Sequence, residues 1–289
     1  MAVNLATKYA DAALDKFKIG SFTEGVFTAK YSWKGAKTVA VFSNATASMN
    51  DYVRTGSARY GTMEDLGNTV DSMEVDQERS FTGAIDALDT DDTNGTLAAG
   101  AFLAQQIDQK ILPDIDSYRF DALYDACPTG QVSSATAITS GNAYTEYLTG
   151  NEKLDELLVP QAGRVVFATP AYLNYLKLDD NFTKASDLAQ DEILFKGQVG
   201  QVDGNPVIKV PSAIMNGSAY NGADNHVDFM IVHRDAVAAP VKLADYYVHS
   251  AASGNKAPGI HGDLVEGLVV HDCFLLDALN TGIYVHKHA

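Results

Sequence analysis

The sequence predicts an α+β fold, and three observations predict it. The chain has 289 residues, of which 46% are hydrophobic and 20% are charged, as expected of a folded globular protein whose core needs no disulfide or metal. Segments with the period of a strand and segments with the period of a helix both occur along it. They do not alternate regularly, which argues against a doubly wound parallel sheet.

The charge balance limits the partners of the chain. It has 21 Lys and Arg against 37 Asp and Glu, a net charge of −16. Contacts to phosphate need Lys or Arg, so binding to a nucleic-acid backbone and adhesion to anionic lipid are disfavoured. No signal peptide and no apolar run of bilayer length is visible, so we expect a cytoplasmic chain or a part of something assembled there. Its two cysteines, Cys127 and Cys273, are expected to be buried thiols.

Residues 1–36 are expected to form an N-terminal arm. The segment Asn4 to Phe17 can form an amphipathic helix, because apolar residues recur in it at a spacing of four. Three glycines then interrupt any periodicity up to residue 36. The arm has no core of its own, so it should be ordered only by packing on something else.

Residues 37–92 are predicted to form a β-arm that projects from the body. Thr38 to Phe42 is rich in β-branched and aromatic residues, and Met73 to Asp86 alternates between apolar and polar residues. The second run alone would reach about 45 Å as one strand, which is too long for a compact core. The intervening segment Asn50 to Gly67 is either a solvated loop or a contact surface, since it holds the Tyr and Arg residues that favour interfaces.

The longest predicted helix runs from Thr96 to about Asp125, with an apolar stripe at spacings of three and four. Pro113 lies within it and should kink the helix or split it in two. The acidic run Asp89 to Thr96 is expected to be a turn that caps this helix. It is not expected to be a calcium loop, because Thr90 and Ala101 stand where an EF-hand needs Asp and Glu.

The rest of the chain mixes helices and strands. We expect one helix through Tyr144 and Leu158 and another that begins at Pro170. Predicted strands comprise Arg164 to Thr169, a hairpin from Gly197 to Pro211 about an Asp-Gly turn, Val227 to Val232, Leu264 to Leu276, and Gly282 to His286.

No group of residues indicates catalysis. The sequence contains no P-loop, no dinucleotide-binding glycine motif, no zinc-protease motif and no nucleophile elbow. All 7 histidines lie in the last third of the chain, but their spacing gives no helical metal pair, so structural or surface roles are favoured. We therefore predict no cofactor, no metal and no enzymatic activity. A soluble enzyme or binding protein that uses this histidine-rich third stays open as an alternative.

Several segments resemble the major capsid proteins of tailed phages with the Hong Kong 97-like fold. Met49 to Thr62, together with Glu78 to Thr82, resembles their extended loop. Gln106 to Arg119 is similar to their spine helix, with its proline, and Gly197 to Pro211 is similar to a hairpin of their apical domain. Gly282 to His286 resembles their closing strand. The resemblance follows the right order over nearly the whole chain.

The resemblance implies a shell subunit that assembles with itself into hexamers and pentamers around double-stranded DNA. It implies an N-terminal arm at 1–36, an extended loop at 37–92, a peripheral domain with the spine helix at 93–135, an apical domain at 136–250 and return strands of the peripheral domain at 251–289. No scaffolding segment precedes the arm in this sequence, so scaffolding is expected either from a separate protein or not at all; a portal protein is expected as a further partner, and a decoration protein is an optional one. The location implied is the virion, assembled in the cytoplasm of a bacterial host. A shell of the same fold that encloses cargo enzymes, as in an encapsulin, is the alternative.

Two further expectations follow from the resemblance. The loop should contact a neighbouring subunit through its charged and tyrosine residues, which are Asp51, Tyr52, Arg54, Arg59, Tyr60, Glu64 and Asp65, together with Arg79. The shell should also lack the lysine–asparagine cross-link of the family's prototype, because no lysine occurs between Lys37 and Lys110.

Overall fold

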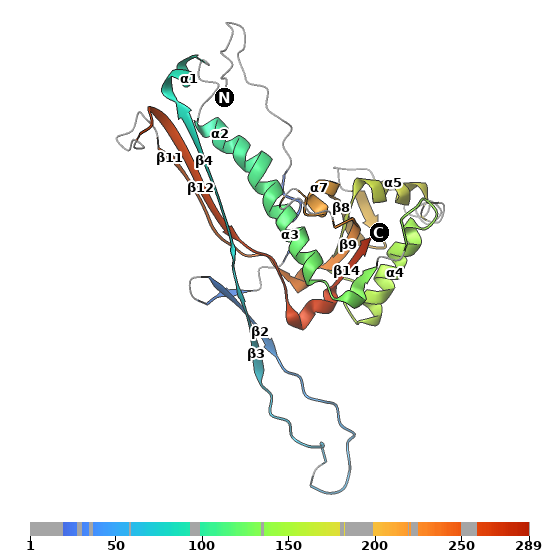
Figure 1. Ribbon diagram of the computed structural model, residues 1–289. Coiled ribbons are helices and arrows are strands. Elements are labelled where there is room, and N and C mark those ends of the chain that lie inside the picture. Colours follow the sequence, from blue (N-terminus) through green and yellow to red (C-terminus); the bar gives the residue numbers. More distant parts are fainter. Residues whose placement is uncertain are drawn as a thin grey trace.

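The structure is a computed structural model of the chain. It describes residues 20–27, 31–34, 37–57, 59–92, 99–133, 136–179, 182, 199–218, 220, 225–249 and 259–288. The helix expected at Asn4 to Phe17 lies outside these residues. Figure 1 shows a compact body on one side, a long helix and long strands that run away from it, and a thin β-arm that extends in another direction.

A six-stranded sheet forms the centre of the compact body. Its order is β5 (Val132–Ser133), β14 (Ile283–Lys287), β9 (Val227–His233), β6 (Arg164–Ala168), β8 (Asn205–Lys209) and β7 (Val199–Val202). The pairs β14–β9, β9–β6 and β8–β7 are antiparallel, whereas β6–β8 and β14–β5 are parallel. The middle strands are buried along their length, which is why they read as apolar runs in the sequence.

Alternate residues of these strands face two separate cores. On one side, Val165 and Phe167 of β6 pack with Phe120 and Leu123 of the long helix. On the other side, residues such as Val166 pack beneath α4 (Ala143–Glu156) and α5 (Pro170–Leu178). Pro170 occupies the first turn of α5, and the Thr169 side chain accepts a hydrogen bond from the Tyr172 N–H, so the local sequence specifies where this helix begins.

The long helix is not split in two at Pro113, which was one of the two outcomes expected of that residue. It consists of α2 (Ala99–Gln106), a π-helical turn η1 (Ile107–Ile111) and α3 (Leu112–Ala126). The residues at the junction, Ile111 and Leu112, keep helical dihedral angles. Pro113 lies in the first turn of α3, and the wider π turn just before it accommodates the missing N–H without splitting the helix.

A long three-stranded antiparallel sheet runs beside this helix (Figure 1). Its order is β11 (Val241–His249), β12 (Gly262–His271) and β4 (Gln77–Asp86). Ile85 and Val265 of the sheet pack on Ala99, Phe102 and Leu103 of the helix. At its far end the short helix α1 (Ala87–Asp92) occupies part of the segment for which a capping turn was expected.

The expected single strand from Met73 to Asp86 is wrong. The structure breaks it at Val75 and Asp76 into β3 (Asn68–Glu74) and β4. β3 pairs with β2 (Thr38–Asn44), whereas β4 pairs with β12. Two contacts to the body mark the break: Val75 is fully buried, and the Asp76 N–H donates to the Asp272 carboxylate and not to a neighbouring strand.

Short elements complete the fold. β1 (Ser32–Trp33) adds to the edge of β2, and β10 (Val237–Ala238) pairs with β13 (Phe274–Leu275). The strand expected at Leu264 to Leu276 is therefore two strands, β12 and β13. The remaining pieces are α7 (Ser212–Met215) and the 3-10 turns η2 (Thr129–Gln131), η3 (Arg234–Ala236) and η4 (Asp277–Gly282). Among the helices of the described segments, none has the length and apolar character to cross a membrane.

Candidate intersubunit surface

From here on, the name β-arm covers only the projecting part of the chain, which is β1, β2, β3 and the loop at residues 45–67. This β-arm exposes many apolar side chains. The most exposed of these lie in the loop, where Met49 is 98%, Met63 91% and Tyr60 83% exposed. The full set of exposed large apolar residues on the β-arm is Trp33, Phe42, Met49, Tyr52, Val53, Tyr60, Met63, Leu66 and Val70. An exposed apolar surface of this extent on one thin projection is typical of a protein–protein contact.

The loop has defined local structure. The ladder of β2 and β3 continues into it, since the Ala45 N–H donates to the Gly67 carbonyl at 3.0 Å. At its end the rings of Tyr52 and Tyr60 meet edge to face with centroids 5.2 Å apart, and the Val53 N–H donates to the Arg59 carbonyl at 3.0 Å. These contacts join the two sides of the loop. A β-ribbon with so little packing is only marginally stable alone, so a covering surface would stabilise it.

The root of the β-arm is fixed to the body through Asp272, which is 3% exposed. Its carboxylate accepts hydrogen bonds from the Asp76 N–H at 2.9 Å, from the Tyr118 hydroxyl at 2.5 Å and from the Cys273 N–H at 2.8 Å. Burial, followed by the Asp272 carboxylate, raises the pKa of Tyr118, so the hydroxyl stays a donor. One carboxylate therefore joins the β-arm, the long helix and the end of β12.

Two ion pairs lie beside this root. Lys37 and Glu78 meet at 2.6 Å, and their hydrogen bond raises the pKa of Lys37 and lowers the pKa of Glu78. Arg79 binds Asp114 of α3 through Nε at 3.0 Å and Nη2 at 2.9 Å. Both pairs are about half exposed at the basic partner, so their contribution to stability is small.

The eight residues expected at a subunit contact fall into two places. Seven lie in the loop, and all seven are exposed: Asp51, Tyr52, Arg54, Arg59, Tyr60, Glu64 and Asp65. Arg79 lies instead in β4, where its bidentate partner Asp114 belongs to the same chain and its guanidinium also lies over the Tyr220 ring at 5.3 Å. The sequence interpretation missed the exposed apolar residues Phe42, Met49, Met63 and Leu66. For Met49, Met63 and Leu66 the signal was available, since large apolar residues are unusual in a polar, glycine-containing loop, whereas Phe42 lies in β2.

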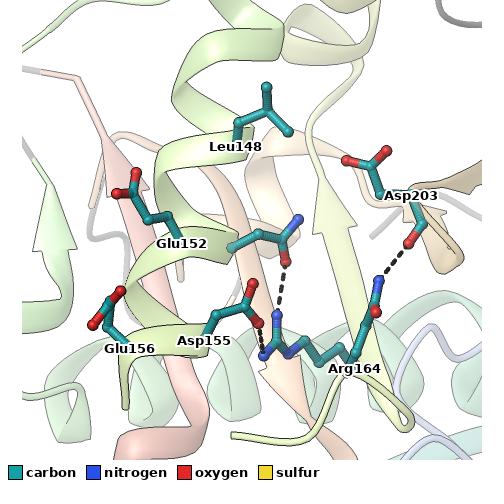
Figure 2. Close-up of a pocket in the computed structure, with 8 residues that line it drawn as sticks. Leu148, Glu152, Asp155, Glu156, Arg164 and Asp203 are labelled. Atoms are coloured by element: carbon teal, nitrogen blue, oxygen red, sulfur yellow. Dashed lines mark hydrogen bonds and ion pairs between the residues drawn. The ribbon is translucent and has the colours of Figure 1, made fainter. Parts of the chain in front are cut away.

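The body has an acidic depression of about 640 Å³ between α4, β6 and the turn after β7. Figure 2 shows Glu152, Asp155 and Glu156 on one side and Asp203 on the other, around the buried Arg164. Arg164 donates to Asp155, to Asn151 and to two backbone carbonyls, so each nitrogen of its guanidinium has a partner. The arrangement is that of a structural arginine that fixes the end of α4.

The histidines do not form a metal centre in the described part of the chain. His286 and His288 both approach the Asp228 carboxylate at 3.2 Å, and the buried His286 ring stacks on Phe229. No group of three or more potential ligands in the described residues has an arrangement that could hold a metal ion. Burial raises the pKa of both Cys127 and Cys273 to about 12, which leaves them as unreactive thiols.

Comparison with known proteins finds similarity in structure and not in sequence. No family model matches the sequence, and no curated protein matches it. A solved chain from Mycobacterium phage Che8 superposes with a TM-score of 0.70 at 17% identity, over 98% of this chain and 96% of that chain.

Two solved capsid structures are similar to the same degree. A chain of the capsid of Cyanophage P-SCSP1u gives a TM-score of 0.67 at 17% identity, over 98% of this chain and 93% of that chain. A chain from the mature capsid of bacteriophage PhiM1 gives a TM-score of 0.67 at 12% identity, over 99% and 93%.

These matches identify the fold. Nearly the whole chain superposes on nearly the whole length of phage capsid chains, so the expected α+β, Hong Kong 97-like capsid fold is confirmed. At identities of 17% or less the likeness concerns the fold alone, and function requires the separate argument that follows.

Proposed function

We propose that this chain is the structural subunit of an icosahedral phage head, which self-assembles into hexamers and pentamers of a closed shell around double-stranded DNA. The observation that carries the proposal is the β-arm, a thin ribbon that projects far from the compact body (Figure 1) and carries exposed apolar residues. Such a surface is poorly placed for a monomer and well placed for burial against an identical neighbour.

The proposed contact combines apolar area with charge. Tyr52 and Tyr60 offer rigid aromatic area, and Met49 and Met63 offer adaptable apolar area. Arg54 and Arg59 would form ion pairs with carboxylates of the neighbour, and Asp51, Glu64 and Asp65 would meet its cations. We propose that Arg79 acts at the root, where it orients the β-arm through Asp114.

We propose the same division of the chain that the resemblance implied. Residues 1–36 would be the N-terminal arm, 37–92 the extended loop, 93–135 the peripheral domain with the spine helix, 136–250 the apical domain, and 251–289 the return strands. The two cores on the faces of the central sheet would then each contain residues from more than one of these parts of the chain.

The acidic balance fits the proposed contents of the shell. With a net charge of −16, the wall of the shell would repel the DNA backbone, so it would release packaged DNA and would not bind it sequence-specifically. Separate scaffolding, portal and decoration proteins would assist assembly in the cytoplasm of a bacterial host, and the finished subunit would reside in the virion. Its role would be structural and not enzymatic.

The direct test removes the loop. Residues 50–67 are replaced by a two-residue turn, and the subunit is expressed and examined by negative-stain microscopy. The full chain should form closed shells or capsomers, and the deletion variant should fold but stay unassembled, because the loop ends far from the core of the body (Figure 1). Normal shells from the deletion variant would refute the proposal.

A matched pair of substitutions tests whether assembly depends on the apolar surface of the β-arm or on the polarity of the protein surface in general. Met63→Ser changes a β-arm residue that is 91% exposed, and Leu158→Ser changes a residue of the body that is 89% exposed. Neither residue contributes much to the core of the monomer, so both variants should melt like the parent subunit. Only Met63→Ser should raise the subunit concentration needed for assembly.

A further inference from the structure

A cavity of about 230 Å³ lies where residues 20–27 cross α3 and the start of β11. Phe27, Tyr31, Ala239 and Val241 supply most of its apolar lining. Arg119 of α3 supplies its cation. The volume is below the roughly 300–1,000 Å³ of sites for drug-sized ligands, so the cavity suits a small molecule or a single side chain.

Arg119 is buried without a full set of partners. It is 7% exposed, and among the described residues its guanidinium makes one hydrogen bond, from Nη1 to the Thr23 hydroxyl at 2.7 Å. Its Nε–H is buried and has no partner in the described part of the chain. A buried guanidinium costs free energy unless its charge and its N–H groups are satisfied; the Asp116 carboxylate lies 4.0 Å from Nη1, but the Nε–H still lacks an acceptor within the described segments.

The neighbouring carboxylate does not fill this role. Asp116 approaches Arg119 only to 4.0 Å, and its two oxygens already accept hydrogen bonds from the Ser21 hydroxyl, the Phe22 N–H and the Thr23 hydroxyl. Its capacity is therefore used to hold residues 21–23 on α3. Arg164 provides the contrast within the same chain, because that buried arginine has a partner at every nitrogen.

We propose that this cavity binds a carboxylate that carries a short apolar group. The carboxylate would accept from the Nε–H of Arg119, and the apolar group would lie against Phe27 and Val241. Glu24 also lines the cavity, but it is exposed and its charge is screened by solvent. The carboxylate can come from a free small acid or from an acidic side chain of a neighbouring copy; the second source rests on the proposed shell function.

The first experiment uses the isolated subunit and does not depend on assembly. Butyrate is the probe, and butyramide, which has the same shape without the charge, is the control at equal ionic strength. Butyrate about tenfold above its Kd should raise Tm by about 2–4 °C, because it binds only the folded chain. It should also shift one arginine Nε–H resonance. An equal response to butyramide would overturn the proposal.

Two variants assign the response to the cavity. Arg119→Met removes the cation but keeps the volume, and Ala239→Leu fills the space but keeps the cation. Both should abolish the response to butyrate, whereas Arg79→Met, which changes the exposed arginine paired with Asp114, should retain it. If Arg119→Met does not fold, Ala239→Leu alone decides the matter. A response that persists in Ala239→Leu would place the binding elsewhere and refute the site.

A second experiment on assembled particles identifies the source of the carboxylate. If an acidic side chain of a neighbour fills the cavity, assembled particles should not respond to butyrate, and excess butyrate should slow assembly relative to butyramide. If a free acid is the ligand, assembled particles should respond as the isolated subunit does. Failure of the subunit to assemble would contradict the proposed function, while the titration of the isolated subunit would still test the site.

Discussion

Removal of the Asp272 carboxylate should loosen the root of the β-arm and destabilise the whole subunit. Asp272→Ala leaves two donors from distant parts of the chain, the Asp76 N–H and the Tyr118 hydroxyl, without their acceptor. Each buried donor left unsatisfied costs about 1–3 kcal/mol, so the variant should lose about 2–6 kcal/mol of unfolding free energy. The loss falls at the lower end of this range if water hydrates the two donors. It also falls there if removal of the buried carboxylate saves the free-energy cost of desolvating its charge.

Urea unfolding of the isolated subunit measures this loss, and two milder variants apportion it. Tyr118→Phe removes one donor and should cost about 1–2 kcal/mol, and Asp272→Asn keeps one acceptor oxygen but loses the charge. The double variant that combines Asp272→Ala with Tyr118→Phe should be less destabilised than the sum of those two single variants, by more than about 0.5 kcal/mol. The reason is that the two side chains are in direct contact.

Hydrogen exchange shows where the structure loosens. In Asp272→Ala the Asp76 amide should exchange faster by more than the global loss of stability explains, whereas the amide of Ile231 in β9 should follow global stability alone. A loss of less than about 1 kcal/mol in Asp272→Ala, or exact additivity in the double variant, would refute the assignment of Asp272 as the residue that fixes the β-arm.

Three further predictions concern charge and cohesion. Arg59→Ala should impair assembly more than it lowers the Tm of the subunit, because Arg59 lies in the exposed loop; equal effects would contradict an intersubunit role. Mature particles boiled in detergent with reductant should run as one band near 30.9 kDa, and a ladder of covalent oligomers would show that a cross-link exists after all. Burial and the nearby Arg119 and Arg79 lower the pKa of His271 from 6.5 to about 4. The unfolded chain therefore binds the extra proton first, and stability should fall by about 3 kcal/mol as the pH drops from 6.5 to 4. His271→Gln should lose less stability over that range, and an unchanged pH profile would exclude this cause.

The sequence predicted the local elements of this fold well where one physical signal was strong. Pro170 after a buried strand located the start of α5, and the Asp203-Gly204 pair located the hairpin of β7 and β8. Continuous apolar runs predicted β6, β9 and β14, because a strand that is buried on both faces is apolar at nearly every position. The lysine-free interval between Lys37 and Lys110 is likewise a property of the sequence alone.

The sequence predicted less where contacts between distant residues decide the outcome. β11 was not expected, because Val241 to His249 mixes charged and aromatic residues and acquires its strand form by pairing with β12. The helix through Pro113 was expected to kink or split, and the π turn that keeps it continuous has no sequence signature of its own. The loop residues of the candidate contact were identified by type, but no neighbour in the isolated chain reveals their partners.

The sequence by itself therefore determined the class of fold, many of its local helices and strands, and the acidic, lysine-free character of the β-arm, because these depend on composition and on the spacing of neighbouring residues. Only the tertiary structure decided which strands pair and where the β-arm begins. The period of two in Met73 to Asp86 states which side chains share a face, but it says nothing of which strand lies at the edge. Residues far along the chain make that choice. β12 pairs with β4, and the Asp272 carboxylate accepts a hydrogen bond from the Asp76 N–H at the point where the ribbon ends. A buried carboxylate needs hydrogen-bond donors, and here the tertiary structure supplies one from a distant segment.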